Sequence, residues 1–175
     1  MSIDVETRSI IGQLTSHIIA IYQITIPINN IDEVVETIGG RVIEREDLSE
    51  YFEGSIRKVD DDSFEIVVSK HQPLNRRSFT IAHELGHLFL HMGYRIDIEH
   101  WRRQTDVYYR MGNSQEEYEA NEFAAALLMP EADYKSALER HTKGNIVDTV
   151  AIANEFNVSV NAASNRGKWL GYLQW

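Results

Sequence analysis

The sequence predicts an α+β fold with an N-terminal helix, a small antiparallel or mixed sheet, two packed helices, and a C-terminal helical mini-domain. Apolar residues recur at three- and four-residue steps near both ends of the chain, as on amphipathic helices. Three short segments between residues 41 and 69 are instead rich in β-branched residues. The 175 residues contain no repeat, low-complexity tract or interdomain linker, which favours one compact unit.

The N-terminal part should hold two helices. Apolar residues from Ile10 to Tyr22 mark one face of the first, and Pro27 ends that segment. A second helix is expected over 31–38, because Asn30 can cap its start and Gly39 can stop it.

The segments "RVIER", "GSIRKV" and "SFEIVVS" are expected to be strands. The last two flank Asp60-Asp61-Asp62, so they should form a hairpin through an acidic turn. "SFEIVVS" is compatible with an open edge that pairs with an extended substrate, and equally with a covered interior strand.

The second half should be mainly helical. The predicted helices are 78–91, 116–129, 131–141, 146–156, and a short final one, with "KGN" between the third and fourth. Residues 93–115 show no clear period and are expected to be a long loop, of the kind that is often functional.

Composition limits the possible functions. A net charge of −10 argues against direct nucleic-acid binding or an anionic membrane surface. The chain has no cysteine, so any metal must be held by histidines and carboxylates. It shows neither a secretory signal nor a membrane-spanning run, which makes the cytoplasm the expected location.

The stretch "FTIAHELGHLFLH" carries a metal-site pattern. His83 and His87 lie four residues apart, so a helix projects both imidazoles from one face. Glu84 sits beside that face, where it can reach the attacking water as a general base. This is the H-E-x-x-H arrangement of zinc peptidases, and its neighbours are too apolar for a solvated helix face.

A catalytic zinc usually takes three protein ligands. Four glutamates of the following helix compete to be the third: Glu116, Glu117, Glu119 and Glu122. Glu117 is favoured because Asn121, four residues on, can accept a hydrogen bond from a ligating imidazole. Glu119 projects about 200° around the helix from Glu117, away from the same site.

Other polar residues near the motif have less defined roles. His91 lies one helical turn beyond His87, too far for a shared cation, so a structural or pocket-wall role is favoured. The candidates for stabilising an oxyanion, or for lining the pocket, are His91, Tyr94, Tyr108 and Tyr109. Zn²⁺ is the expected ion, while Mn²⁺ and Fe²⁺ suit the same donors.

"RSFTIAHELGHLFLH" followed by "EYEANEFAAALLMP" resembles the ImmA/IrrE family of metallopeptidases, over roughly residues 10–172. The resemblance implies a gluzincin-like site with His83, His87 and Glu117 as ligands and Glu84 as the catalytic glutamate. We expect a zincin-like core over 1–130 and a helix-turn-helix-like segment over 131–175 that packs on it. The resemblance further implies a zinc-dependent endopeptidase whose protein substrate is a helix-turn-helix (XRE-type) repressor, with cleavage relieving repression.

Two other functions compete with this one. "TVAIANEFNVSVNAASNRGKWLG" has the look of a helix-turn-helix, which would make the chain a DNA-binding regulator. Against it, residues 146–166 contain one basic residue, Arg166, and phosphate contacts dominate DNA affinity. The second alternative is a metal-binding partner protein of a toxin–antitoxin or phage regulatory pair that acts by binding alone.

Overall fold

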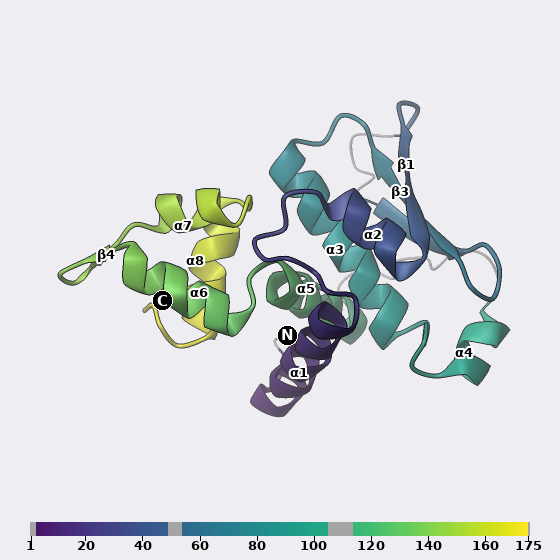
Figure 1. The fold of residues 1–175 in the computed structure, drawn as a ribbon, viewed down its shortest axis with the longest axis horizontal. Helices are drawn as coiled ribbons and strands as arrows, with labels where there is room; N and C mark the ends of the chain where they lie inside the picture. The colour runs from purple at the N-terminus through teal and green to yellow at the C-terminus, as the bar shows by residue number, and fades with distance from the viewer. Residues whose placement is uncertain (1–2, 49–53, 105–113, 175) are drawn as a thin grey trace.

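The computed structural model describes residues 3–48, 54–104 and 114–174. Its elements follow the predicted order of helix, sheet and helices, which confirms the α+β class (Figure 1). In chain order they are α1 (Val5–Ile21), α2 (Ile31–Ile38), β1 (Gly40–Arg45), β2 (Gly54–Lys58), β3 (Phe64–Ser69), α3 (Leu74–Leu90), α4 (Ile98–Arg103), α5 (Gln115–Leu128), α6 (Glu131–Arg140), β4 (Thr142–Lys143), β5 (Ile146–Val147), α7 (Thr149–Glu155) and α8 (Val160–Trp169).

Local sequence signals explain several helix ends. At α2 the Asn30 side chain accepts a hydrogen bond from the backbone N–H of Asp32, and Gly39 ends the helix with a φ of 115°. At α5 the Ser114 hydroxyl accepts from the backbone N–H of Glu117, and the helix ends before Pro130. These caps fix where α5 begins, and therefore where its glutamates point.

The main sheet has the order β1-β3-β2, with β1 parallel and β2 antiparallel to β3. The predicted hairpin through the acidic turn is therefore confirmed. Strand β3 is central and buried along nearly its whole length, so of the two readings of "SFEIVVS" the open edge is wrong. The apolar run from Ile66 to Val68 already favours an interior strand, since both of its faces are covered.

A charged triplet crosses this sheet. Glu65 of β3 lies in register between Arg41 of β1 and Arg57 of β2, and it is hydrogen-bonded by both. Burial raises the pKa of Glu65, but the hydrogen bonds and positive charges of the two arginines more than offset this, so the net pKa is lowered. The ionised carboxylate therefore helps to hold the three strands in register.

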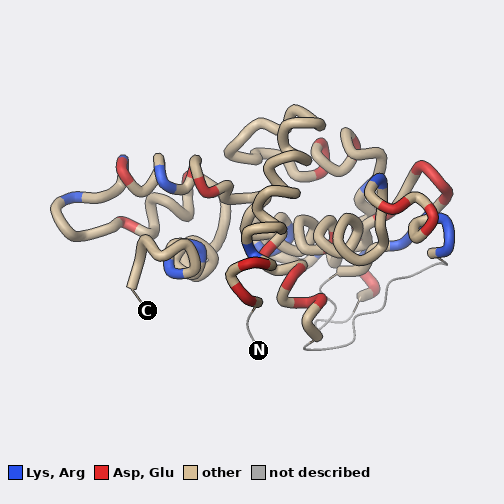
Figure 2. Tube along the Cα trace, turned by 90° about the horizontal axis from the view of Figure 1, so that it is seen from below, with Lys and Arg blue, Asp and Glu red and all other residues tan. Residues whose placement is uncertain are grey.

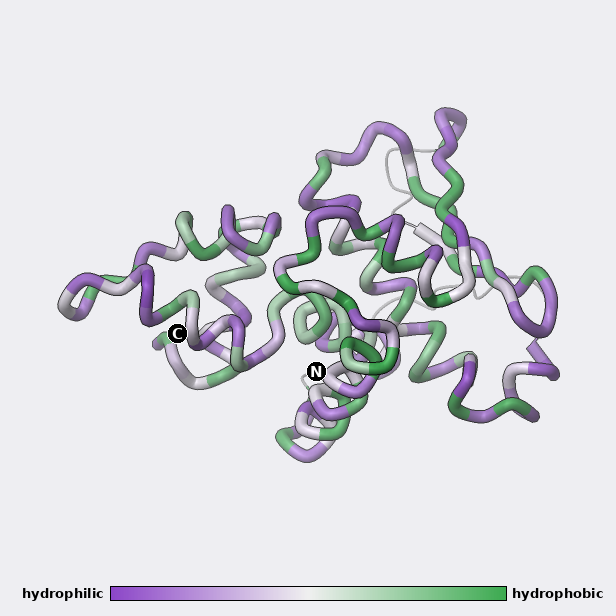
Figure 3. Tube along the Cα trace, in the orientation of Figure 1, coloured by the Kyte–Doolittle hydropathy of each residue, from purple (hydrophilic) through white to green (hydrophobic). Residues whose placement is uncertain are grey.

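Helices α3 and α5 approach each other closely, and α1 packs against α5. A Cβ atom placed on Gly86 of α3 would lie 2.9 Å from the Cα atom of Ala120 on α5. The missing side chain of Gly86 therefore lets the two backbones nearly touch. Figure 1 shows α5 between α1 and α3, and Figure 3 shows apolar residues recurring along these helices. The contact brings the H-E-x-x-H motif against the N-terminal turns of α5.

Three predicted boundaries need correction. The helix expected from residue 78 already begins at Leu74, directly after Pro73. The expected loop 93–115 contains α4, which Asp97 caps and Trp101 anchors in the core. The helix expected from residue 146 begins only at Thr149, because Ile146–Val147 pair with Thr142–Lys143 in a short hairpin.

The C-terminal segment contains a helix, a tight turn at Asn157 with φ 54°, and a second helix, α8. Buried Arg166 of α8 ties it to the core, because its guanidinium bonds the Glu122 carboxylate at 2.8 Å and the Met129 carbonyl at 3.0 Å. Burial lowers the pKa of Arg166, and the Glu122 charge opposes that shift. Arg8 of α1 also bonds Glu122 and lies over the ring of Trp169.

The distribution of charged residues and the length of the apolar helices are relevant to nucleic-acid and membrane partners. Figure 2 shows the lysines and arginines of the traced residues scattered among the acidic ones. Within the described ranges, no helix is both long enough and apolar enough to cross a bilayer.

Candidate metal centre and active site

Three ligand-type atoms converge between α3 and α5. His83 and His87 are 5% and 0% exposed, and their Nε2 atoms lie 3.0 Å apart. The Glu117 carboxylate reaches both, with its Oε2 3.3 Å from Nε2 of His83 and its Oε1 3.2 Å from Nε2 of His87. Among the described residues, this is the trio of acidic and histidine side chains whose donor atoms are grouped tightly enough for a metal.

The protonation of His83 indicates why a cation fits here. Its Nδ1 lies 3.0 Å from the side-chain oxygen of Asn121, which accepts a hydrogen bond. The proton of a neutral His83 therefore sits on Nδ1, and Nε2 presents a lone pair to the centre. Bonds of about 2.0–2.1 Å in a tetrahedral zinc site place ligand atoms about 3.3 Å apart, close to the observed separations.

His87 is oriented by a second chain of hydrogen bonds. Its Nδ1 lies 2.9 Å from Nδ1 of His91, and Nε2 of His91 lies 3.2 Å from a carboxylate oxygen of Glu119. The carboxylate accepts from His91, which leaves the Nδ1 of His91 to accept from His87. The Nε2 of His87 then carries a lone pair, as the Nε2 of His83 does. His91 thus lies outside the ligand set, and the sequence alone did not indicate the part played by Glu119.

Glu84 is 1% exposed and lies where strand β2 meets α3. A Cβ atom on Gly54, the first residue of β2, would lie 3.1 Å from a carboxylate oxygen of Glu84 and 2.6 Å from the Thr80 methyl group. Gly54 therefore allows β2 to pass directly beside the carboxylate. Among the described residues, β2 is an edge strand of the sheet, and its first residue borders the candidate active site.

Of the tyrosines considered for oxyanion stabilisation, the structure describes Tyr94 alone. Tyr94 is fully buried, and its hydroxyl donates hydrogen bonds to the carbonyls of Ile38 and Asp62, each at 3.0 Å. Its ring packs in the core against Phe64 and Trp101, so the expectation of a catalytic or pocket role for Tyr94 is corrected. Tyr108 and Tyr109 lie outside the described residues.

Two buried histidines and a glutamate around a shared centre, with a second glutamate beside them, define a metallopeptidase of the H-E-x-x-H type. A sequence model of the family described as "IrrE N-terminal-like domain" matches residues 40–168, most of the chain. The chain therefore belongs to this metallopeptidase family, and the resemblance to ImmA/IrrE proteins is confirmed.

Several solved chains match the fold. One of them, described as a "Mycobacterium tuberculosis transcriptional regulator", superposes with a TM-score of 0.60 at 17% sequence identity. The match covers 97% of this chain and 52% of that one, so the chain spans about half the length of that relative. At this identity the likeness shows the fold alone. No curated protein matches the chain.

Proposed function

We propose that this metallopeptidase is a zinc-dependent endopeptidase that cleaves a helix-turn-helix (XRE-type) repressor in the cytoplasm and so relieves repression. The observation that carries the catalytic part is the buried His83, His87 and Glu117 centre with Glu84 beside it. Zinc is favoured by the donor set and the spacing, while Mn²⁺ and Fe²⁺ suit the same ligands. The choice of repressor rests on the family resemblance.

The residues of the chain divide the chemistry among them. A divalent ion held by the three ligands supplies Lewis acidity and makes water more acidic. Glu84 takes the proton from the attacking water and later delivers it to the leaving amine. Asn121 and His91 hold the imidazoles in the orientation and tautomer that ligation needs. The low exposure of the centre keeps bulk water away from these groups.

Strand β2 is the proposed place for the substrate backbone. It is an edge strand, and Gly54 brings it against Glu84, so an extended peptide that pairs with β2 would run past the general base. A folded helix cannot form such pairs, so the cleaved bond should lie in an extended segment of the repressor.

Several observations disfavour the DNA-binding alternative. Residues of α8 line a cavity that faces α3 and α5, and Arg166 is buried in an ion pair with Glu122. A recognition helix needs its cations free for phosphates. We propose instead that residues 131–175 are a mini-domain that packs on a 1–130 core. The binding-only alternative gives no use for a carboxylate such as Glu84 beside the metal ligands.

The test pairs capture with cleavage. The Glu84→Gln chain should keep its zinc and hold one helix-turn-helix regulator in the native host, identified by mass spectrometry. The purified regulator should then be cut by the zinc-loaded wild-type chain, and at least a hundredfold more slowly by Glu84→Gln. Glu116→Gln, a change at an exposed glutamate of the same region, should cut normally. A regulator that is captured but stays intact with the wild type would favour a binding partner instead.

A further inference from the structure

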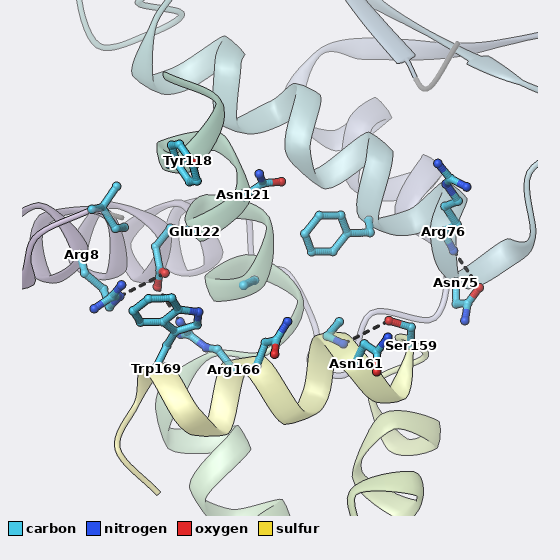
Figure 4. Close-up of a pocket in the computed structure, with 15 residues that line it drawn as sticks. Arg8, Asn75, Arg76, Tyr118, Asn121, Glu122, Ser159, Asn161, Arg166 and Trp169 are labelled. Carbon is cyan, nitrogen blue, oxygen red and sulfur yellow. Dashed lines mark hydrogen bonds and ion pairs between the residues drawn. The ribbon is translucent and has the colours of Figure 1, made fainter. Parts of the chain in front are cut away.

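Two cavities border the C-terminal segment. The larger, about 590 Å³, lies between α3, α5 and α8 (Figure 4). The smaller, about 490 Å³, lies between α7 and the residues around the starts of α2 and α3. Asn75 at the start of α3 lines both cavities, so they meet at this residue, and we call the two cavities together the seam.

The seam is unusually rich in asparagine. The chain has ten asparagines, and eight of them line one or both parts of the seam. These eight are Asn29, Asn30, Asn75, Asn121, Asn154, Asn157, Asn161 and Asn165. Because asparagine is found on surfaces generally, an even scatter would leave most of them elsewhere. Most of the side-chain amides of asparagine therefore lie along the seam.

Some of these amides already have a structural task. Asn30 caps α2, Asn121 orients His83, and Asn157 hydrogen-bonds toward the loop before α2. Asn154, Asn161 and Asn165 differ, because they are exposed and, across the described part of the chain, their side-chain amides bond no other protein group and are open to a ligand. Asparagine is also a weak helix former in a helix interior, where Asn165 lies.

We propose that the seam binds an extended segment of the polypeptide substrate next to the scissile bond. A side-chain amide offers one carbonyl acceptor and N–H donors, which match the N–H and C=O of a peptide group. The rings of Phe79, Tyr118 and Trp169 line the larger cavity and suit an apolar side chain of the bound segment. This inference deepens the proposed function and rests on its peptidase activity, not on which repressor is cut.

The larger cavity of the seam lies next to residues that adjoin the metal ligands. Asn121 lines it and accepts the hydrogen bond of the ligand His83, and Tyr118 directly follows the ligand Glu117. Along α3, Asn75 precedes His83 by eight residues, which is about 12 Å of helix. An extended peptide covers that distance in about four residues. The seam is therefore expected to contact substrate residues up to about four positions from the cleaved bond, on one side of that bond.

The test uses a proteome-derived peptide library on the zinc-loaded Glu84→Gln chain, which is immobilised, with bound peptides counted by mass spectrometry. Adding Asn161→Ala and Asn165→Ala should reduce capture at least tenfold. A second variant, Ala162→Trp, fills the seam from α8 and should do the same. Asn145→Ala, at an exposed asparagine outside the seam, is the matched control and should leave capture unchanged. Unfolding temperatures verify that each variant is folded.

The outcomes separate this inference from the proposed function. Equal capture by the parent and both seam variants, or no capture by the parent, overturns the seam as a peptide site. If capture depends on the seam but the wild type cuts no repressor, the seam is supported as a peptide site and the repressor is rejected as the substrate. Repressor cleavage that is equal in the wild type and the seam variants leaves the proposed function standing without the seam.

Discussion

The side-chain oxygen of Asn121 lies 3.0 Å from Nδ1 of His83, while Glu117, one turn earlier on α5, approaches the other nitrogen of the same ring. One helix therefore supplies both a metal ligand and the group that orients another ligand. We expect Asn121→Ala to weaken zinc binding about 10- to 100-fold, because the imidazole loses its fixed tautomer. A competition titration with a chromophoric chelator measures this. Asn121→Asp keeps an acceptor and should restore most of the affinity, whereas unchanged affinity in Asn121→Ala would remove the orienting role.

The chain from Glu119 through His91 to His87 gives a parallel expectation. Glu119→Ala or His91→Phe should each weaken zinc binding about tenfold, at the lower end of such effects, because the ligand itself stays in place. The two changes combined should cost little more than either alone, since they break one chain of hydrogen bonds. Glu116→Ala, on the first turn of the same helix, is the control. Fully additive losses in the double variant would contradict a relay.

The contact between α3 and α5 depends on Gly86. Gly86→Ala should lower the free energy of unfolding by about 1–3 kcal/mol, because the new methyl group overlaps Ala120 and forces the helices apart. Gly12 of α1 is a matched helical glycine whose added Cβ would meet nothing within 4 Å. Gly12→Ala should therefore stabilise the chain by up to about 1 kcal/mol. Urea unfolding measures both, and similar effects at the two sites would refute the close contact.

The lowered pKa of Glu65 makes part of the stability pH-dependent. A carboxyl with a lowered folded pKa adds stability above its ordinary value of 4.5, and loses it as the pH falls through the folded pKa. Wild type should therefore unfold at a higher temperature than Glu65→Gln at pH 7, and the difference should shrink below pH 4.5. Thermal unfolding from pH 7 downward measures it. A difference that stays constant with pH would mean that the charge does not contribute.

Sequence patterns were sufficient where the physical cause is local. The α2 ends follow from Asn30 and Gly39, and the H-E-x-x-H spacing alone places His83 and His87 on one helix face. Glu117 could be distinguished from the neighbouring glutamates because Asn121, four residues later, faces the same way and can accept a hydrogen bond from a ligating imidazole.

Features that depend on distant contacts were missed. Trp101 stabilises the short helix α4, because its ring packs on Tyr94 and its N–H donates a hydrogen bond to the Asp61 carbonyl, 40 residues earlier. The same packing takes Tyr94 out of the active site. The hydrogen bond between Glu119 and His91 forms because one side of α5 faces His91. That orientation depends on the close approach of the two helices at Gly86.

The depth of the metal centre has a kinetic consequence for any folded substrate. With His83, Glu84 and His87 nearly inaccessible and β2 alongside, only a main chain freed from its own secondary structure can reach the general base. The rate of cleavage then scales with how often the target segment opens. Under the proposed function, local stability of the target would then govern substrate choice in part, and heat or point mutations that loosen a target segment would raise its rate of cleavage without any change in the enzyme.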